Sequence, residues 1–165
     1  GLLDQAARVG LAQVTGALGP MDRSAVQAAI RPRLLAIDRD NLAYVKSVLP
    51  KDGWFRRSRD GEIAATRAWL IVHHSDDWSF QRQVLERMAP LLTSSEIRPS
   101  NYALLHDRIA MHDGKPQRYG SQFDCRNGRT RLYEVESRDG LDERRASVGL
   151  EPIAVYLRDG EGQPC

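Results

Sequence analysis

The sequence has few cysteines, few lysines and no long apolar run. Its only cysteines are Cys125 and Cys165, whose spacing matches no zinc or redox motif and allows at most one disulfide bond. The cysteines therefore do not indicate whether the protein works in an oxidising or a reducing compartment. No run of about 18 apolar residues is present, so we expect no membrane-spanning helix and a soluble protein. Internal repeats and low-complexity tracts are also missing.

The charges are nearly balanced. The chain has 24 lysines and arginines against 22 acidic residues, giving a net charge of +2, and only three of the basic residues are lysines. Arginine can recognise carboxylate or phosphate groups, although a codon bias would give the same excess. Acidic residues are interleaved throughout, and the arginine clusters at 56–59 and 126–131 are short. Without a basic stripe, we expect no nucleic-acid partner.

The length predicts one compact domain. A chain of 165 residues with 41% hydrophobic residues can bury a core without metal or disulfide support. Residues 1–20 contain several glycines and end in Gly19-Pro20, so we interpret them as an N-terminal leader or peripheral segment. Residues 21–165 are then a single globular domain. The chain begins without methionine, which fits a trimmed piece or a processed export precursor, so cytoplasmic and exported locations both stay open.

Apolar residues recur at three- and four-residue spacing in four segments, which predicts four helices. These run from Asp22 to Val48, from Gly61 to His74, from Asp77 to Met88, and from Ser100 or Asn101 to His112. Pro32 should break the first helix or lie in a first turn. Asp77 is a natural N-cap for the third.

A β-hairpin should follow the helices. Asn127-Gly128 is typical of a type I′ turn, and it separates predicted strands at 117–125 and 130–135. Cys125 would be a small core residue in the first strand. Two short helices should follow, one capped by Asp142 and one beginning at Pro152. The fold class is therefore α+β and mainly α: a bundle of four or more helices, a small antiparallel β-hairpin and short C-terminal helices.

Polar residues that could take part in catalysis or binding are concentrated between residues 69 and 122. His73 and Asp107 are the candidate catalytic residues, His73 as general acid or base and Asp107 as the group that orients it. His73 could equally be a structural histidine at a helix C-terminus. Arg108 borders the apolar face of its helix, where a guanidinium binds a substrate or ties the hairpin to the bundle.

Other candidate substrate-binding residues lie later in the chain. Gln117, Tyr119 and Gln122 belong to a polar strand around Gly120, which signals a bulge or a close backbone approach. This strand could recognise a polar substrate or a peptide, or it could be purely structural. Arg144 and Arg145 could bind an anion or form surface ion pairs.

Several motifs together resemble the bacterial family DUF6624, a domain of unknown function. They span roughly residues 38–157 and comprise NLAYVK at 41–46, GW at 53–54, AWLIVHH at 68–74, FQ at 80–81, ALLHDR at 103–108, QRYGSQ at 117–122 and DERRASVGL at 142–150. The resemblance places the family's histidine on His73 and its aspartate on Asp77. Ser121 stands where the family usually has threonine, and Trp78 where it usually has proline. The resemblance nominates positions and supplies no reaction.

These observations leave three function classes. The first is a small hydrolase or transferase that uses a His, Asp, Arg and Gln site on a polar or anionic substrate, without a cofactor. The second is a non-catalytic module that binds a peptide or protein. The third is a metal-dependent phosphohydrolase of the HD type, in which His73 or His74 and His106-Asp107 would hold metal. We assign no metal ligand, and the partner, the oligomeric state and the state of the cysteines stay open.

Overall fold

The structure is a computed structural model that describes residues 19–165. The predicted leader at residues 1–20 lies outside the described residues except for its last two. The described elements are α2 (Pro20–Ser47), α3 (Arg57–Asp60), α4 (Glu62–His74), α5 (Trp78–Met88), the 3-10 helix η1 (Ala89–Leu91), α6 (Pro99–His112), β1 (Phe123–Arg126), β2 (Arg129–Leu132), α7 (Leu141–Ser147) and α8 (Ile153–Gly160). The predicted fold class, mainly α with one small antiparallel hairpin, is confirmed.

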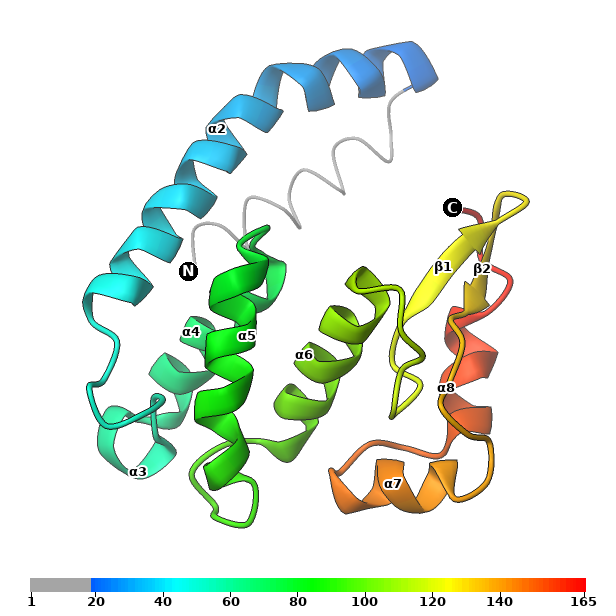
Figure 1. The fold of residues 1–165 in the computed structure, drawn as a ribbon. Coiled ribbons are helices and arrows are strands. Elements are labelled where there is room, and N and C mark those ends of the chain that lie inside the picture. Colours follow the sequence, from blue (N-terminus) through cyan, green and yellow to red (C-terminus); the bar gives the residue numbers. More distant parts are fainter. Residues whose placement is uncertain (1–18) are drawn as a thin grey trace.

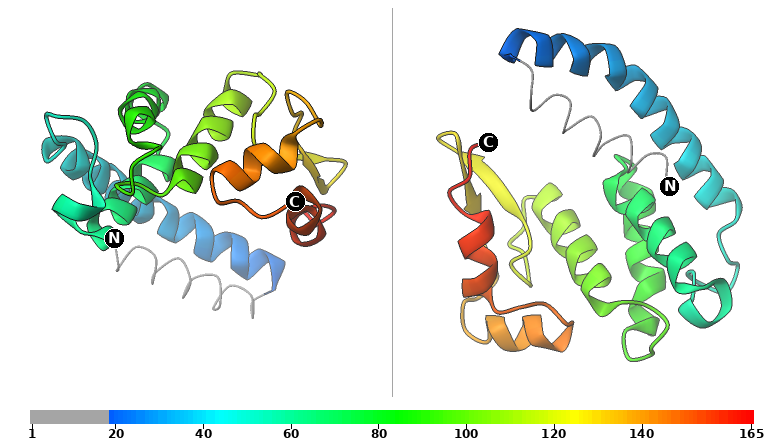
Figure 2. Two further views of the ribbon diagram at one scale, coloured as in Figure 1. Left: turned by 90° about the horizontal axis from the view of Figure 1, so that it is seen from below. Right: turned by 180° about the vertical axis from the view of Figure 1, so that it is seen from behind.

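Helix α6 lies between two groups of elements (Figures 1 and 2). On one side it packs with α5 and α4, and α2 runs along the outside of these helices. On the other side lie the hairpin, α7 and α8. We call residues 19–112 the helical lobe and residues 117–165 the C-terminal lobe. Within the described range, no helix is both long enough and apolar enough to cross a bilayer.

The main core lies in the helical lobe, where apolar faces of four helices meet. Its buried members are Val45, Trp54, Ala68, Trp69, Val72, Phe80, Val84, Met88, Ile97, Leu105 and Ile109. The three- and four-residue spacing of apolar side chains within each helix places them on one face, which packs inward. The C-terminal lobe adds a much smaller cluster, in which Tyr119 and Val148 pack on Ala103 of α6.

Helix ends follow local chemistry, with three corrections to the expected pattern. Asp77 caps α5 as predicted, since its Oδ1 accepts the Phe80 N–H at 3.0 Å. The prediction that Pro32 breaks the first helix was wrong, because α2 continues through it; Pro32 is exposed, so water can satisfy the carbonyl that loses its donor. Helix α6 begins at Pro99, one residue before the expected cap, because proline is suited to a first helical turn. Gly140, not Asp142, occupies the N-cap position of α7.

The hairpin has the predicted turn and shorter strands than predicted. Asn127 and Gly128 have φ values of 54° and 71°, as a type I′ turn requires. Phe123 pairs with Leu132, and the register continues to the turn. The expected strand at residues 117–122 is wrong, because the backbone turns at Gly120 (φ 66°) and its N–H groups bond to a side chain.

A disulfide joins Cys125 of β1 to Cys165, with a Cα–Cα distance of 5.9 Å. The tail also pairs with β2, where Thr130 N donates to Gln163 O and Gly162 N donates to Thr130 O. The prediction that Cys125 is a small core residue was therefore wrong, because the residue is exposed and its side chain forms the disulfide.

Candidate functional site

Asp107 lies on α6 and is fully buried. Its carboxylate accepts backbone N–H groups from the loop that follows the helix. Arg118 N lies 2.9 Å from Oδ1, Tyr119 N lies 3.1 Å from both oxygens, and Ser121 N lies 3.1 Å from Oδ2. These amides surround the carboxylate as they would surround a bound anion, so the loop binds a side chain of its own chain.

These contacts occupy both oxygens of Asp107. His106 Nδ1 adds a further contact at 3.3 Å. Between residues 19 and 165, no hydrogen bond joins Asp107 to His73. No hydrogen bond thus supports the predicted orientation of His73 by Asp107, whose carboxylate instead holds the loop.

Arg145 holds the same loop from the opposite side. Its side chain is 1% exposed, and Nη1 donates to the carbonyls of Tyr119 at 2.7 Å and Gly120 at 3.0 Å. Nε donates to Glu151 O, and the guanidinium lies 4.9 Å from the centroid of the Tyr156 ring. A buried arginine needs such partners because an unpaired guanidinium would lose its hydration without replacement.

The side chain of Gln117 closes the loop on itself. Its amide Nε2 donates to Gln122 O and Tyr133 O, and its Oε1 accepts the Gln122 N–H at 2.8 Å. The Tyr156 hydroxyl donates to Ser121 O at 2.8 Å. We call Asp107, Gln117, Arg145 and Tyr156 together the loop frame; they satisfy much of the backbone of residues 117–122.

Arg144 is also tied to the backbone. Its guanidinium donates to the carbonyls of Arg118, Asp139 and Ser137. Tyr119 is 8% exposed and packs in the small cluster of the C-terminal lobe. A role in substrate binding for the predicted residues of this region, including Gln122, stays a prediction.

His73 lies elsewhere, at the corner between α4 and α5. Its ring stacks on Trp69 with centroids 4.6 Å apart, and its Nδ1 is buried without a hydrogen-bond partner. Burial lowers its pKa to about 4, and the positive charges of Arg108 and His74 contribute in the same direction. The imidazole is therefore neutral at pH 7 and offers one N–H and one lone pair.

Arg108 projects from α6 toward the same corner. Its guanidinium lies 5.0 Å from the centroid of the Trp78 ring, and its Nε is buried without a partner. Burial lowers its pKa, and the charge of Asp76 opposes this effect. Within the described range, no carboxylate forms an ion pair with Arg108.

Gln81 is the third buried polar residue at this corner, and it was absent from the predicted site. It is fully buried on α5; Nε2 donates to Ser75 O at 2.7 Å, and Oε1 has no partner. The available signal was its position between Phe80 and Val84 on the apolar face of the helix. We call His73, Gln81 and Arg108 the unpaired corner, because each has a buried polar atom without a partner.

Comparison with known protein families identifies the family of the chain. A family model described as "Family of unknown function (DUF6624)" matches residues 4–163. The chain belongs to this family. The predicted resemblance is confirmed and extends beyond residues 38–157. Nothing matches among the curated proteins or the solved structures.

The motifs on which the resemblance was based divide between two places in the structure. The segment QRYGSQ at 117–122 belongs to the loop frame, together with Asp107 and Arg145. His73, Gln81 and Arg108 belong to the unpaired corner. Over residues 19–165, no three His, Cys, Asp or Glu side chains gather as a metal site would require. The polar side chains of the loop frame are thus hydrogen-bonded, whereas each residue of the corner keeps one buried atom without a partner, as do Arg56 and Asp124 elsewhere.

Proposed function

We propose that this DUF6624 domain binds a small anionic substrate at the unpaired corner and acts as a hydrolase or transferase in which His73 accepts a proton. The observation that carries the proposal is that α4, α5 and α6 each supply one buried polar atom without a partner, on residues that lie at or contact the α4–α5 corner. Buried polar groups in folded proteins are nearly always hydrogen-bonded, so such a cluster favours a ligand.

The charges at the corner favour an anion. Arg108 has its guanidinium on the face of Trp78 and no carboxylate as an ion-pair partner among residues 19–165. A phosphate or carboxylate would supply the missing acceptors in a partly dehydrated place, where a charged hydrogen bond is strong. Gln81 would contribute its Oε1 as an acceptor for a substrate hydroxyl or amide.

His73 is neutral throughout the neutral range, because its pKa lies near 4, so its ring has a lone pair that can accept a proton. A bound anion would raise this pKa toward the operating pH, where a general base is most effective. The loop frame would act indirectly, since Asp107 is the neighbour of Arg108 on α6 and fixes this helix against the loop. Asp107 is then a positioning residue for the site.

Binding can be tested with inorganic phosphate as the probe. Phosphate should raise the melting temperature of the wild-type protein in a saturable manner at constant ionic strength. Arg108→Gln should abolish this increase, whereas Arg158→Gln, at an exposed surface arginine, should retain it. An equal phosphate effect in all three proteins would overturn the proposed anion site.

Catalysis needs a separate measurement. Chromogenic phosphate and acetate esters should be turned over by the wild type and at least 100-fold more slowly by His73→Gln, as expected for loss of a general base. Phosphate binding without turnover of a broad ester panel would contradict the enzyme proposal and leave the non-catalytic binding module.

A further inference from the structure

The disulfide between Cys125 and Cys165 lies at the surface of the C-terminal lobe, since both residues are exposed. It attaches residues 161–165, the tail, to β1, and Figure 1 shows the tail running from α8 back along the hairpin. Exposed disulfides are more often the labile and regulatory ones, because an attacking thiolate needs access to one of the sulfurs. A dithiol can therefore approach this bond while the protein is folded.

Three backbone hydrogen bonds join the tail to the hairpin, all at residues 128–130. Gly162 N donates to Thr130 O at 2.8 Å, and Thr130 N donates to Gln163 O at 2.9 Å. Cys165 N donates to Gly128 O at 3.2 Å. At an exposed strand edge such bonds compete with water, so their net contribution is small. The hairpin residues that also contact the tail through side chains are Arg129, Thr130 and Arg131.

Helix α8, which leads into the tail, is weakly held. It has eight residues, and none of Ile153–Gly160 is buried. An isolated helix of this length is not stable in water, so its contacts with the rest of the lobe must hold it. Ile153 N donates to Asp142 Oδ1 at its start, and the Thr130 hydroxyl donates to Gly160 O at its end, at 2.6 Å. The tail and the disulfide restrain this second end.

Tyr156 connects α8 to the loop frame. The centroid of its ring lies 5.3 Å from that of Phe123 and 4.9 Å from the Arg145 guanidinium, and its hydroxyl donates to Ser121 O. Gly160 approaches Phe123 so closely that a Cβ added there would lie 2.5 Å from the ring. Movement of α8 away from the hairpin would therefore separate Tyr156 from the loop, which would lose one member of its frame.

We propose that the Cys125–Cys165 disulfide is a reversible redox switch, which holds α8 and the loop frame in place when oxidised and loosens both when a dithiol reduces it. A thiolate of the dithiol attacks one sulfur, and the second thiol of the dithiol then resolves the mixed disulfide. The dithiol becomes a disulfide and gives up two electrons and two protons, which the two cysteine thiols gain. The oxidised form of the same dithiol reverses the step.

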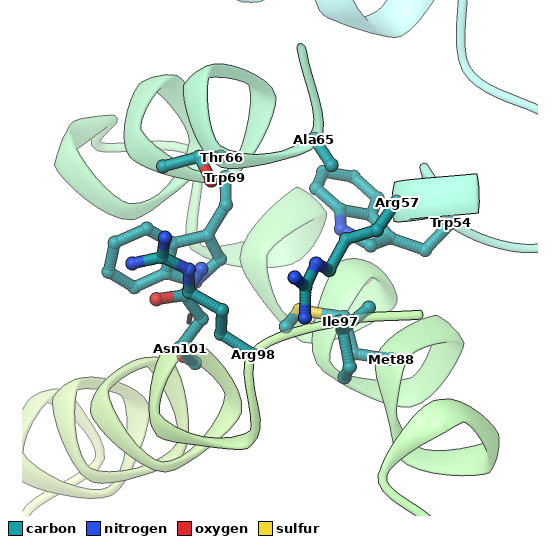
Figure 3. Close-up of a pocket in the computed structure, with 9 residues that line it drawn as sticks. All are labelled: Trp54, Arg57, Ala65, Thr66, Trp69, Met88, Ile97, Arg98 and Asn101. Carbon is teal, nitrogen blue, oxygen red and sulfur yellow. Dashed lines mark hydrogen bonds between the residues drawn. The ribbon is translucent and has the colours of Figure 1, made fainter. Parts of the chain in front are cut away.

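The switch is local, because the helical lobe has a core of its own. The buried apolar residues of this core lie between Val45 and Ile109, outside α8 and the tail. Trp54 and Trp69 belong to it and line a small hollow with room for about one water molecule (Figure 3). Tryptophan fluorescence therefore reports whether the helical lobe stays folded. The switch is also independent of the proposed function at the unpaired corner.

Hydrogen exchange of the oxidised and reduced protein tests the switch. Complete reduction by dithiothreitol without denaturant should accelerate exchange of the Tyr156, Glu161 and Gly162 amides about tenfold or more, while tryptophan fluorescence stays native. Addition of oxidised dithiothreitol should restore the slow rates. Unchanged exchange in α8, or loss of native fluorescence on reduction, would overturn the proposal.

Two further measurements separate a switch from a purely structural disulfide. Reduced thioredoxin, a protein dithiol, should reduce the bond in the folded protein; a bond that stays oxidised in its excess would refute the switch. The loop amides of Tyr119 and Ser121 should exchange faster in the reduced protein and also in oxidised Tyr156→Phe, which lacks the hydroxyl. Faster exchange confined to the tail would show that reduction does not reach the loop frame.

The Cys125→Ser/Cys165→Ser double variant is the matched control. Its α8 and loop amides should exchange like those of the reduced wild type, with or without dithiothreitol. A response of this variant to the reductant would show that the effect does not come from the disulfide.

Discussion

At the scale of single residues, Asp107 and His73 represent opposite solutions to burial. The buried side chain of Asp107 has hydrogen-bond partners for both oxygens, because three backbone amides donate to it. His73 has no partner for Nδ1 and remains neutral. The first solution stabilises the fold, and the second leaves a group available for chemistry.

Replacement of Asp107 by asparagine should destabilise the protein by about 2–4 kcal/mol, because the amide cannot accept all the N–H groups that the carboxylate accepts. Asp159→Asn is a matched control: Asp159 is 76% exposed beside Arg158, and its change should cost less than about 0.5 kcal/mol. Urea denaturation measures both. Similar losses in the two variants would show that Asp107 does not hold the loop.

The low pKa of His73 predicts a pH dependence of stability. The His73 imidazole is protonated near pH 6.5 in the unfolded chain and near pH 4 in the native protein. The stabilisation from the neutral ring is complete above pH 6.5 and is lost as the pH falls from 6.5 to 4, by at most about 1.4 kcal/mol per pH unit. His73→Phe should lack this component. NMR titration would contradict the assignment if the His73 ring protonated near pH 6.5.

At the scale of elements, local signals were predictable from the sequence and distant partners were not. The cap at Asp77 and the turn at Asn127-Gly128 depend on neighbouring residues, and both were predicted correctly. The sequence could not show that the partners of Asp107 are amides 11 to 14 residues further along, because no periodic pattern records such a contact.

The same limit applies to the predicted strand at 117–122 and to the disulfide. The alternation of polar residues suggested a strand, but this backbone forms a loop, in which N–H groups donate to Asp107 and carbonyls accept from Arg145. Two cysteines 40 residues apart allow a bond without requiring one. Gln81 was missed because its position on the apolar face of the helix indicates burial but does not show that Oε1 has no partner.

The disulfide should stabilise the C-terminal lobe. It closes a segment with a sequence separation of 40 residues, for which the chain-entropy model gives up to roughly 4 kcal/mol. Reduction or Cys165→Ser should therefore lower the free energy of unfolding by about 2–4 kcal/mol. The Cys125→Ser/Cys165→Ser double variant should not respond to reductant. An unchanged denaturation curve after complete reduction would contradict this expectation.

At the scale of the whole molecule, α6 couples the two lobes (Figure 1). It supplies Leu105 and Ile109 to the main core and Ala103 to the small cluster. Asp107, on the same helix, binds the first loop of the C-terminal lobe. Loss of this contact should affect the C-terminal lobe before the helical lobe.

Two probes can separate the lobes. All three tryptophans lie in the helical lobe, so their fluorescence reports its unfolding, whereas hydrogen exchange of residues 118–132 reports the C-terminal lobe. In Asp107→Asn, these amides should exchange at denaturant concentrations where the fluorescence is still native. Coincident loss of both signals would show that the lobes remain one cooperative unit.

The loop frame also implies an order of events during synthesis. Asp107 leaves the ribosome before the loop and can accept the N–H groups of the loop as soon as these have been synthesised. The carbonyls of Tyr119 and Gly120, however, must wait for Arg145, and that of Ser121 for Tyr156. These carbonyls of the nascent loop therefore lack their partners until α7 and α8 leave the ribosome, so the final shape of the loop requires both helices.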